Sequence, residues 1–277
     1  MSNSEPKSKF QLILAKTKYP NTVESMALDL TALGVKEGDV AIVHSSLSSI
    51  GWVCNDQSAV VLALIKAFGT DDTIVMPAHT SSNYDPAEWE NPPIPKEWHE
   101  TVRQSIPAYD KNITPSEFMG VIAECFRCFP GTLRSDHPIH SFTARGKIAG
   151  QIIGTHVLTP CFGMDTPLGE LYRLNAKVLL LGAPYSSCTV FHLAEVLSDL
   201  PGMIKQGCAI YENGKWIWKW YEDFDCDSGD FQQIGEAFEA VGLVHCGKVG
   251  NADCKLFDVK PAVDFALEWI VKNRSRG

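Results

Sequence analysis

The 277-residue sequence has few of the signals that mark nucleic-acid-binding proteins, membrane proteins or secreted proteins. It has no excess of positive charge, since 24 Lys and Arg face 33 Asp and Glu and the formal net charge is −9. A nucleic-acid partner is therefore not expected, because affinity for phosphate backbones comes mainly from clustered Lys and Arg. No apolar run approaches the ~20 residues that cross a bilayer. The polar start MSNSEPKSKFQ predicts no signal peptide. We expect a cytoplasmic protein with no membrane partner.

Several catalytic and structural signatures are also missing. The nine cysteines have no framework spacing, which favours reduced thiols over disulfides. There is no G-x-S-x-G elbow and no glycine-rich nucleotide loop, so nucleophilic-serine hydrolysis and dinucleotide or P-loop binding are not expected. We find no internal repeat, low-complexity tract or linker. With 45% hydrophobic and 21% charged residues, the chain is predicted to fold as one domain over residues 1–277.

What the sequence does contain is an alternation of helical and extended patterns. A helical pattern over 21–33 precedes the strand AIVH (41–44), and a second one over 56–68 precedes DTIVMPAH (72–79). This order predicts an α/β fold, with a parallel or mixed sheet covered on both faces. Further along, the patterns predict a helix over 116–129, strands at 140–146 and 177–183, a helix over 190–199, a hairpin about Asn213-Gly214, and helices over 231–241 and 261–273 around a short strand near Val244.

Residues 81–115 interrupt this alternation. Six prolines lie in the segment, among them Pro92, Pro93, Pro95, Pro107 and Pro115. Proline disfavours regular structure, and long ordered loops in compact domains are often binding loops. We therefore expect a long irregular segment here that takes part in substrate binding.

His192 and Glu195 are the main candidates for acid–base chemistry. They lie three residues apart on a predicted helix, so they share one face, and this helix follows the most strand-like run in the chain. A carboxylate beside an imidazole fixes the ring's tautomer and raises its basicity, as a general base requires. His44 ends its own strand in the same way. If both strands run parallel, their carboxyl ends open onto one crevice. A plain exposed helix pair remains the alternative.

Two further patterns point to other chemistry. His137 and His140 in SDHPIHSF suggest a metal site, and a metal-dependent hydrolase is the alternative reaction class; Pro138 works against the helical geometry that such pairs use. QQIGEA at 232–237 matches the coenzyme A motif of the Gcn5-related acetyltransferases. Four aspartates precede it, which would repel a diphosphate, so we interpret it as a chance match at the start of an amphipathic helix.

Five motifs in order carry a resemblance to a known family. They are VHSSLSSIGWV (43–53), MPAHTSSNYDPAEWENPPIPKEW (76–98), RSDHPIHSF (134–142), DTPLGELYRLNAKVLLLGA (165–183) and FHLAE (191–195). Together they resemble the aminoglycoside 3-N-acetyltransferases, also called antibiotic N-acetyltransferases, and most closely the Bacillus branch. The resemblance covers about residues 20–270. It implies a single-domain α/β/α sandwich with a central mixed sheet, distinct from the Gcn5-related fold.

The resemblance also implies a reaction and a set of site residues. Acetyl-CoA would be the donor, an amine of an aminoglycoside the acceptor, and no metal would be needed. His192, Glu195 and His44 would be catalytic. The coenzyme A site would be formed by His44, Ser45, Ser46, Leu47, Ser48, Gly51, Trp52, Val53, Ser141 and Phe142.

The acceptor is less firmly indicated than the reaction. Acidic residues gather in 81–115 and after the hairpin, where they are either solvated loop charges or a wall for a cationic amine. From them we predict an acceptor site with His79, Asp85, Glu88, Trp89 and Asp223. Where several family members carry an Asp before the H-L-A-E helix, this chain has Ser186-Ser187. This departure keeps open a second hypothesis, the same chemistry on a non-antibiotic amine metabolite.

Overall fold

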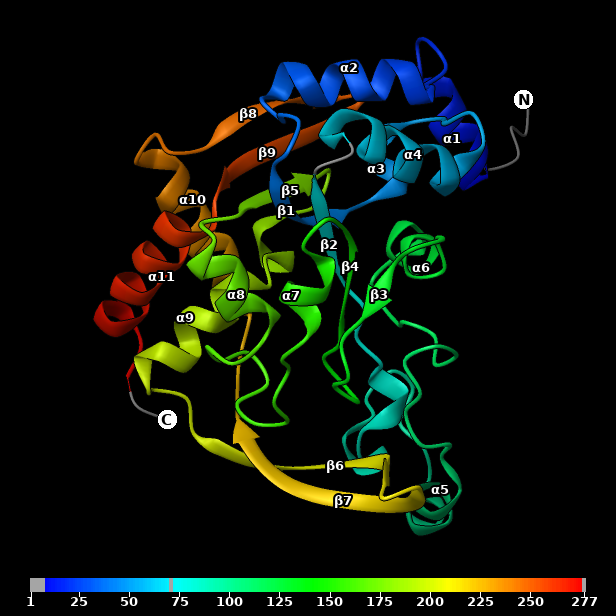
Figure 1. The fold of residues 1–277 in the computed structure, drawn as a ribbon, viewed down its shortest axis with the longest axis vertical. Coiled ribbons are helices and arrows are strands. Elements are labelled where there is room, and N and C mark those ends of the chain that lie inside the picture. The colour runs from blue at the N-terminus through cyan, green and yellow to red at the C-terminus, as the bar shows by residue number, and fades with distance from the viewer. Residues whose placement is uncertain (1–7, 70–71, 276–277) are drawn as a thin grey trace, which may run out of the picture.

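The structure is a computed structural model that describes residues 8–69 and 72–275. Seven strands in the described residues form one sheet in the order β3-β4-β2-β1-β5-β9-β8 (Figure 1). The central strand β1 pairs in parallel with β2 and β5, and all other neighbours are antiparallel. The strands are β1 (Val40–Ser45), β2 (Thr73–Pro77), β3 (Leu133–Arg134), β4 (Phe142–Gly146), β5 (Lys177–Leu181), β8 (His245–Val249) and β9 (Ala252–Asp258). The predicted mixed sheet is confirmed.

Helices cover both faces of this sheet because alternate strand residues point to opposite sides. Ala41 and Val43 of β1 belong to the hydrophobic cluster on one face, and Ile42 belongs to the cluster on the other. The first layer is α2 (Val23–Leu33), α4 (Asp56–Phe68) and α6 (Val121–Arg127). The second is α7 (Ala149–Ile153), α8 (Pro167–Arg173), α9 (Val190–Ser198), α10 (Phe231–Ala240) and α11 (Val259–Asn273). The molecule is the α/β/α sandwich that the sequence predicted.

A separate two-stranded sheet lies beyond the edge of the sandwich, at the bottom of Figure 1. It consists of β6 (Met203–Glu212) and β7 (Lys215–Phe224), joined at Asn213-Gly214 as predicted. Both turn residues have positive φ, +52° and +73°, which is the backbone that Asn and Gly adopt most easily in a two-residue hairpin. The hairpin is therefore specified locally by its turn.

Some sequence predictions of secondary structure were wrong. The segment 81–115 was expected to be irregular, yet α5 (His99–Ser105) forms between Pro95 and Pro107, together with three short 3₁₀ turns, Ser81–Asn83, Pro86–Glu88 and Lys96–Trp98. The prolines lie outside the helix, where they interrupt no helical hydrogen bond. The helix predicted from 116 begins only at Val121. Elements not predicted are α1 (Lys9–Lys16), α3 (Leu47–Ile50), α7, α8, β3, β9 and the 3₁₀ turn Tyr185–Ser187.

The QQIGEA string lies in α10, as the interpretation of a chance match requires. Gly235 packs against Tyr185 so closely that an added Cβ would lie 2.0 Å from the ring. Phe231, Ile234 and Phe238 of the same helix are buried. The glycine thus serves close packing. In the described residues, no helix has both the length and the apolar character to cross a bilayer.

Candidate active site

Three imidazoles meet at the carboxyl ends of neighbouring parallel strands. His44 lies at the end of β1, opposite Leu180 of β5, and His79 follows β2 by two residues. His192 lies in the first turn of α9, the helix after β5. All three line a cavity of about 650 Å³, which we call the first cavity. The predicted common crevice for His44 and His192 is present because β1 and β5 run parallel.

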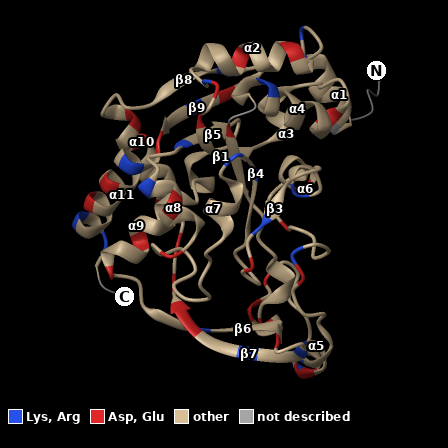
Figure 2. Cartoon of the chain, in the orientation of Figure 1, with Lys and Arg blue, Asp and Glu red and all other residues tan. Residues whose placement is uncertain are grey.

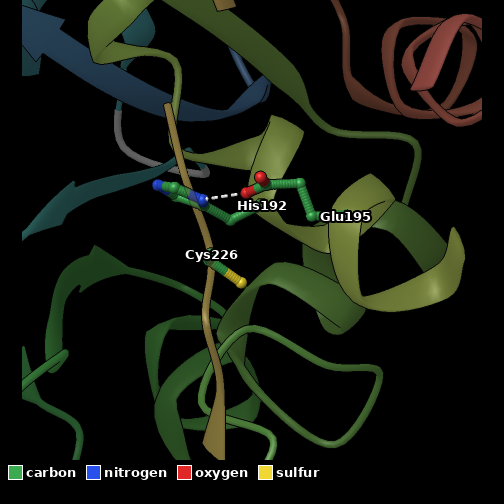
Figure 3. Close-up of side chains that lie close together, drawn as sticks. All are labelled: His192, Glu195 and Cys226. Atoms are coloured by element: carbon green, nitrogen blue, oxygen red, sulfur yellow. Dashed lines mark hydrogen bonds and ion pairs between the residues drawn. The ribbon is translucent and has the colours of Figure 1, made fainter. Parts of the chain in front are cut away.

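His192 and Glu195 form a closely hydrogen-bonded pair. Nδ1 of His192 lies 2.5 Å from Oε2 of Glu195, and the Glu195 side chain is completely buried (Figure 3). A carboxylate only accepts hydrogen bonds, so Nδ1 must carry the proton and donate it. The neutral ring then presents the lone pair of Nε2, which is the atom that a general base uses.

Two phenyl rings hold the His192 ring in place. Phe162 stacks on it, with centroids 4.6 Å apart and planes 10° apart, and Phe231 lies against it at 4.7 Å. Neither residue was predicted from the sequence. Phe162 lies in the connection between β4 and β5, which has no motif that marks it, and only the fold brings it to the site. The ring orientation is thus set by two stacking partners and one carboxylate.

The first cavity contains most of the residues predicted for coenzyme A. His44, Ser45, Ser46, Leu47, Ser48, Gly51, Trp52 and Val53 all line it. Ser141 and Phe142 do not. Both are completely buried, Ser141 in hydrogen bonds with Ala78 and Arg134 and Phe142 in the core of the sandwich, so the fold leaves neither side chain open to a ligand. Lining residues that the sequence analysis missed include Phe10, Ile13, Ser186, Ser187, Ser228, Phe231 and 118–123.

The depth of the first cavity holds polar groups without a protein partner. Nε2 of His44 and Nε2 of His79 are buried and make no hydrogen bond in the structure. Burial, with a smaller contribution from His192, lowers the pKa of His44 to about 4, and burial mainly lowers that of His79 to about 3. Both rings are neutral at physiological pH. Buried polar atoms are rarely left unpaired, so these nitrogens fit a polar ligand such as a thioester and an amine.

Of the two histidines that suggested a metal site, His137 has both ring nitrogens in hydrogen bonds within the protein, whereas Nδ1 of His140 is buried without a hydrogen-bond partner. Nδ1 of His137 accepts from the backbone N–H groups of Ile139 and His140, at 3.1 and 2.8 Å, and Nε2 lies 3.1 Å from the carbonyl of Leu158. Metal ligation by His137 would break these bonds. Burial lowers the pKa of His137 to about 4, which keeps the ring neutral. His137 therefore shapes the turn before β4.

Another group of side chains of metal-ligand types lies at the His192–Glu195 pair. His192, Glu195 and Cys226 have potential ligand atoms within 4.8 Å of one another (Figure 3). Both carboxylate oxygens of Glu195 are already occupied, one by His192 and the other by Arg274 and the N–H of Asp227. The guanidinium also places a positive charge where a cation would have to bind. These donors fit a hydrogen-bonded base better than a metal centre.

A second cavity, of about 1260 Å³, opens between the 81–117 segment and the hairpin. Five carboxylates line it, against one lysine, Lys205, among the described lining residues; they are Glu88, Glu90, Glu117, Asp225 and Asp227. Figure 2 shows the acidic colour at the carboxyl end of β7. Phe118 lines both cavities; it is 79% exposed and has a positive φ of 58°, an unusual backbone for a bulky residue. It marks the junction between them.

The residues predicted for acceptor binding separate into two groups. Glu88 and Trp89 line the second cavity, and His79 lines the first. Asp85 and Asp223 line neither. Asp85 is buried in a two-point ion pair with Arg103, and Asp223 is buried against Thr159 and the N–H of Cys161. Their carboxylates already have partners within the protein, so Asp85 and Asp223 stabilise the fold of the two segments.

The two acidic segments form one wall because the insertion packs on the hairpin. Tyr84 and Cys208 form an isolated antiparallel bridge, and the N–H of Tyr109 donates to the carbonyl of Ala209 at 3.0 Å. Nε1 of Trp216 donates to the carbonyl of Ile106 at 2.9 Å. Segments more than 90 residues apart in sequence thus share one surface.

Comparison with known proteins decides the family. The model of the family described as aminoglycoside 3-N-acetyltransferase matches residues 42–271. The chain belongs to the aminoglycoside 3-N-acetyltransferase family. It is 45% identical over 265 residues to the SPbeta prophage-derived aminoglycoside N(3')-acetyltransferase-like protein YokD of Bacillus subtilis, covering 95% of this chain and 97% of YokD. It is 34% identical to aminoglycoside N(3)-acetyltransferase IX of Micromonospora chalcea, covering 91% and 94% of the two chains.

Solved structures agree with this assignment to the aminoglycoside 3-N-acetyltransferases. The crystal structure of YokD has a TM-score of 0.93 and covers 94% of this chain and 97% of YokD. AAC-IIIb, solved as a binary complex with CoASH, has a TM-score of 0.83 at 29% identity, with 94% and 99% covered. AAC-VIa bound to sisomicin has a TM-score of 0.82 at 25% identity, with 92% and 99% covered. The resemblance and the fold class predicted from the sequence are confirmed. The protein is an acyltransferase, and its acetyl donor is acetyl-CoA.

Proposed function

We propose that the protein transfers acetyl from acetyl-CoA to an amine of an aminoglycoside, the 3-amino group of the aminocyclitol, with His192 and Glu195 as the general-base pair. One observation carries the proposal. Glu195 holds Nδ1 of His192, Phe162 and Phe231 fix the ring, and His192 lines the first cavity. The family's name and the sisomicin complex of AAC-VIa support an aminoglycoside as acceptor.

The reaction needs a base because an aliphatic amine is protonated at neutral pH and an ammonium group has no lone pair. Nε2 of His192 takes one proton from the ammonium group, the free amine nitrogen then bonds to the acetyl carbon, and the nitrogen loses its second proton to solvent. The carbon–sulfur bond then breaks, and the coenzyme A sulfur leaves with the electron pair and takes up a proton. Glu195 stabilises the imidazolium that forms, because its carboxylate accepts from Nδ1 and is buried.

The other two imidazoles of the first cavity, those of His44 and His79, have different roles in the proposed reaction. The neutral ring of His44 has a buried Nε2 without a protein partner, so it is available to the acetyl group or the amine. A hydrogen-bond donor at a thioester oxygen stabilises the negative charge that develops there. We assign His44 to the catalytic centre on this ground, with Ser45 to Ser48, Gly51, Trp52 and Val53 along the coenzyme A side and His79 on the acceptor side.

The second cavity supplies the acceptor site of this proposal. Aminoglycosides are polycations, and its wall carries five carboxylates together with Trp89 and Tyr84. Aromatic and acidic side chains together favour cationic amines. The segment 81–115 is thus part of the acceptor cleft in a single acetyltransferase domain. The nine cysteines are all free thiols, which supports a reducing compartment such as the cytoplasm.

The test is a thiol-release assay with acetyl-CoA and a panel of amines, run with and without chelator. The panel contains sisomicin, further aminoglycosides, and polyamine and amino-sugar metabolites. Release of coenzyme A with aminoglycosides, unchanged by chelator, supports the proposal. Release only with metabolite amines would support the same acetyl transfer, with a metabolite amine as the acceptor in place of an aminoglycoside. Activity lost with chelator would instead favour metal-dependent chemistry.

A further inference from the structure

Arg274, in the segment after the last helix, extends to the catalytic pair. Its Nη1 donates to Oε1 of Glu195, which lies 79 residues earlier in the chain. The same oxygen accepts from the backbone N–H of Asp227 at 3.0 Å, and the other oxygen faces His192. Both oxygens of this completely buried carboxylate are therefore paired. In the described part of the chain, the ion pairs of Glu195 are those with His192 and Arg274.

The same guanidinium also holds a wall of the second cavity. Nε donates to Oδ2 of Asp230 at 2.7 Å, and Nη2 donates to Oδ1 of Asp230 and, at 2.9 Å, to the carbonyl of Asp227. Asp225, Cys226 and Asp227 line that cavity. The hydrogen bonds that Arg274 donates to Asp230 raise the pKa of Arg274 above its ordinary value, so the guanidinium stays charged. One side chain thus links the base pair to the acceptor wall.

A charged partner matters here because the side chain of Glu195 is completely buried. A buried carboxylate without a cation tends to take up a proton and become neutral. A neutral carboxyl group would stabilise the imidazolium of His192 far less. Arginine suits the position because its planar, forked guanidinium donates in several fixed directions at once, whereas lysine is a point charge. The geometry of Arg274 uses four of these directions.

We propose that Arg274 is a positioning residue for acetyl transfer: it keeps Glu195 ionised and aimed at His192, and it fixes the 225–230 wall of the acceptor cavity. This inference rests on the proposed function, in which His192 and Glu195 form the base. It adds a residue that touches neither substrate nor the reacting atoms and acts through two neighbours.

The proposal predicts a change in pH dependence. Removing a positive charge beside the pair makes the pair bind a proton more readily, so the acid limb of the kcat/KM profile should move to higher pH. Charged and titratable groups on all the surrounding elements contribute to this field. They are Asp225, Cys226, Asp227 and Asp230 before α10, His44 and His79 after β1 and β2, and His140 before β4.

The experiment compares Arg274→Met, Arg274→Lys and Asp230→Asn with the parent and with His192→Ala. Arg274→Met should lower kcat roughly tenfold to a hundredfold, less than removal of the base, and displace the acid limb upward. Millimolar guanidinium chloride should restore part of the lost turnover, which a purely structural defect would not allow. Arg274→Lys should lie between parent and Met. Asp230→Asn should mainly raise the acceptor KM, because it loosens the wall of the second cavity but keeps the contact between Arg274 and Glu195.

A matched control is Arg173→Met, which removes a half-exposed arginine that pairs with Glu170 on α8, away from both cavities. Parental kcat and pH profile in Arg274→Met would overturn the inference if His192→Ala is inactive. Near-parental turnover in His192→Ala would instead overturn the proposed base. If Arg274→Met does not fold, Arg274→Lys and Asp230→Asn decide the question, and parental constants in both would reject the proposal.

Discussion

The ring of Phe162 stacks on that of His192, with centroids 4.6 Å and planes 10° apart. Phe162 is 4% exposed and belongs to the core on one face of the sheet. The orientation of the His192 ring is therefore coupled directly to the packing of the core. A small change in this packing should turn the ring without removing any reacting group.

Phe162→Leu tests this coupling. The variant should lose about 1–2 kcal/mol of stability and about tenfold in kcat, because the ring gains freedom to leave its reactive orientation. Steady-state kinetics and thermal unfolding check both effects. Phe68→Leu is the control, since Phe68 is completely buried on the opposite face of the sheet in α4 and should lose stability alone. Equal kcat values in the two variants would contradict the coupling.

Removal of the proposed base, His192, should have a larger effect. His192→Ala should lower turnover about 10²–10⁴-fold while retaining acetyl-CoA binding, which calorimetry measures separately. Glu195→Gln should show a smaller loss and a displaced pH optimum, because the amide still occupies the site but no longer stabilises the imidazolium. A near-parental rate in His192→Ala would move the search for the base to His44.

Acetyl-CoA should stabilise the folded protein. At a hundredfold excess over its dissociation constant, a ligand that binds only the native state adds about 2.7 kcal/mol. A rise in Tm with acetyl-CoA concentration is expected. Gly51→Val should reduce this rise, because Gly51 lines the first cavity and an added Cβ would lie 2.8 Å from Oγ1 of Thr17. An unchanged Tm at millimolar acetyl-CoA would count against the first cavity as the donor site.

Stability should fall steeply with acid between about pH 6.5 and 4. Burial lowers the pKa of His44 and His137 to about 4 and of His79 to about 3, against about 6.5 in an unfolded chain. In this window the unfolded state binds more protons, so stability rises with pH. Asp72 and Asp223 oppose the trend, since burial raises the pKa of Asp72 to about 6 and also raises that of Asp223. They are two groups against five, because burial also lowers the pKa of His140 and His156.

Chemical denaturation from pH 4 to 7 measures this slope. His137→Gln should reduce the slope by up to about 1.4 kcal/mol per pH unit, the contribution of one proton. His245→Gln, at an exposed position on β8, should leave the slope as it is in the parent. An unchanged slope in His137→Gln would mean that this ring is not buried neutral.

The acidic wall should govern the acceptor and not the donor. Substituting Glu88, Glu90 and Asp225 with their amides should raise the acceptor KM about three- to tenfold, because each exposed charge contributes about 0.2–1 kcal/mol. Added salt should raise the parental KM in the same direction, since such attraction is screened beyond ~8–10 Å. Glu24→Gln with Glu268→Gln, on distant helices, is the control. The same acceptor KM in both sets would show that the wall is only solvated surface.

Local patterns in the sequence predicted the helices and strands whose signals are complete within themselves. Helix α4 begins at Asp56 and ends at Phe68, within its predicted limits, since a polar start, an apolar stripe and a closing glycine all lie in one stretch. The hairpin at Asn213-Gly214 is specified in the same way. Helix α5 was missed because the prolines at its flanks dominate the pattern, although they lie outside the helix. Strand β9 was missed because only its pairing with β5 and β8 distinguishes ADCKLFD from a loop.

The residues of the candidate site fall into the same two groups, those that local sequence patterns predict and those that only the fold brings together. His44, His192 and Glu195 stand in motifs that the sequence alone displays, and the spacing of three residues already places the last two on one helix face. The surrounding groups, Phe162, Cys226 and Arg274, come from segments without motifs. The burial of Asp85 and Asp223 could not be predicted from the sequence either. An acidic residue in a sequence does not show whether a partner such as Arg103 lies beside its carboxylate in the folded chain. Sequence determines which groups a short stretch presents together. Which distant groups meet them depends on strand order and layer packing, because those contacts exist only once the sheet has assembled.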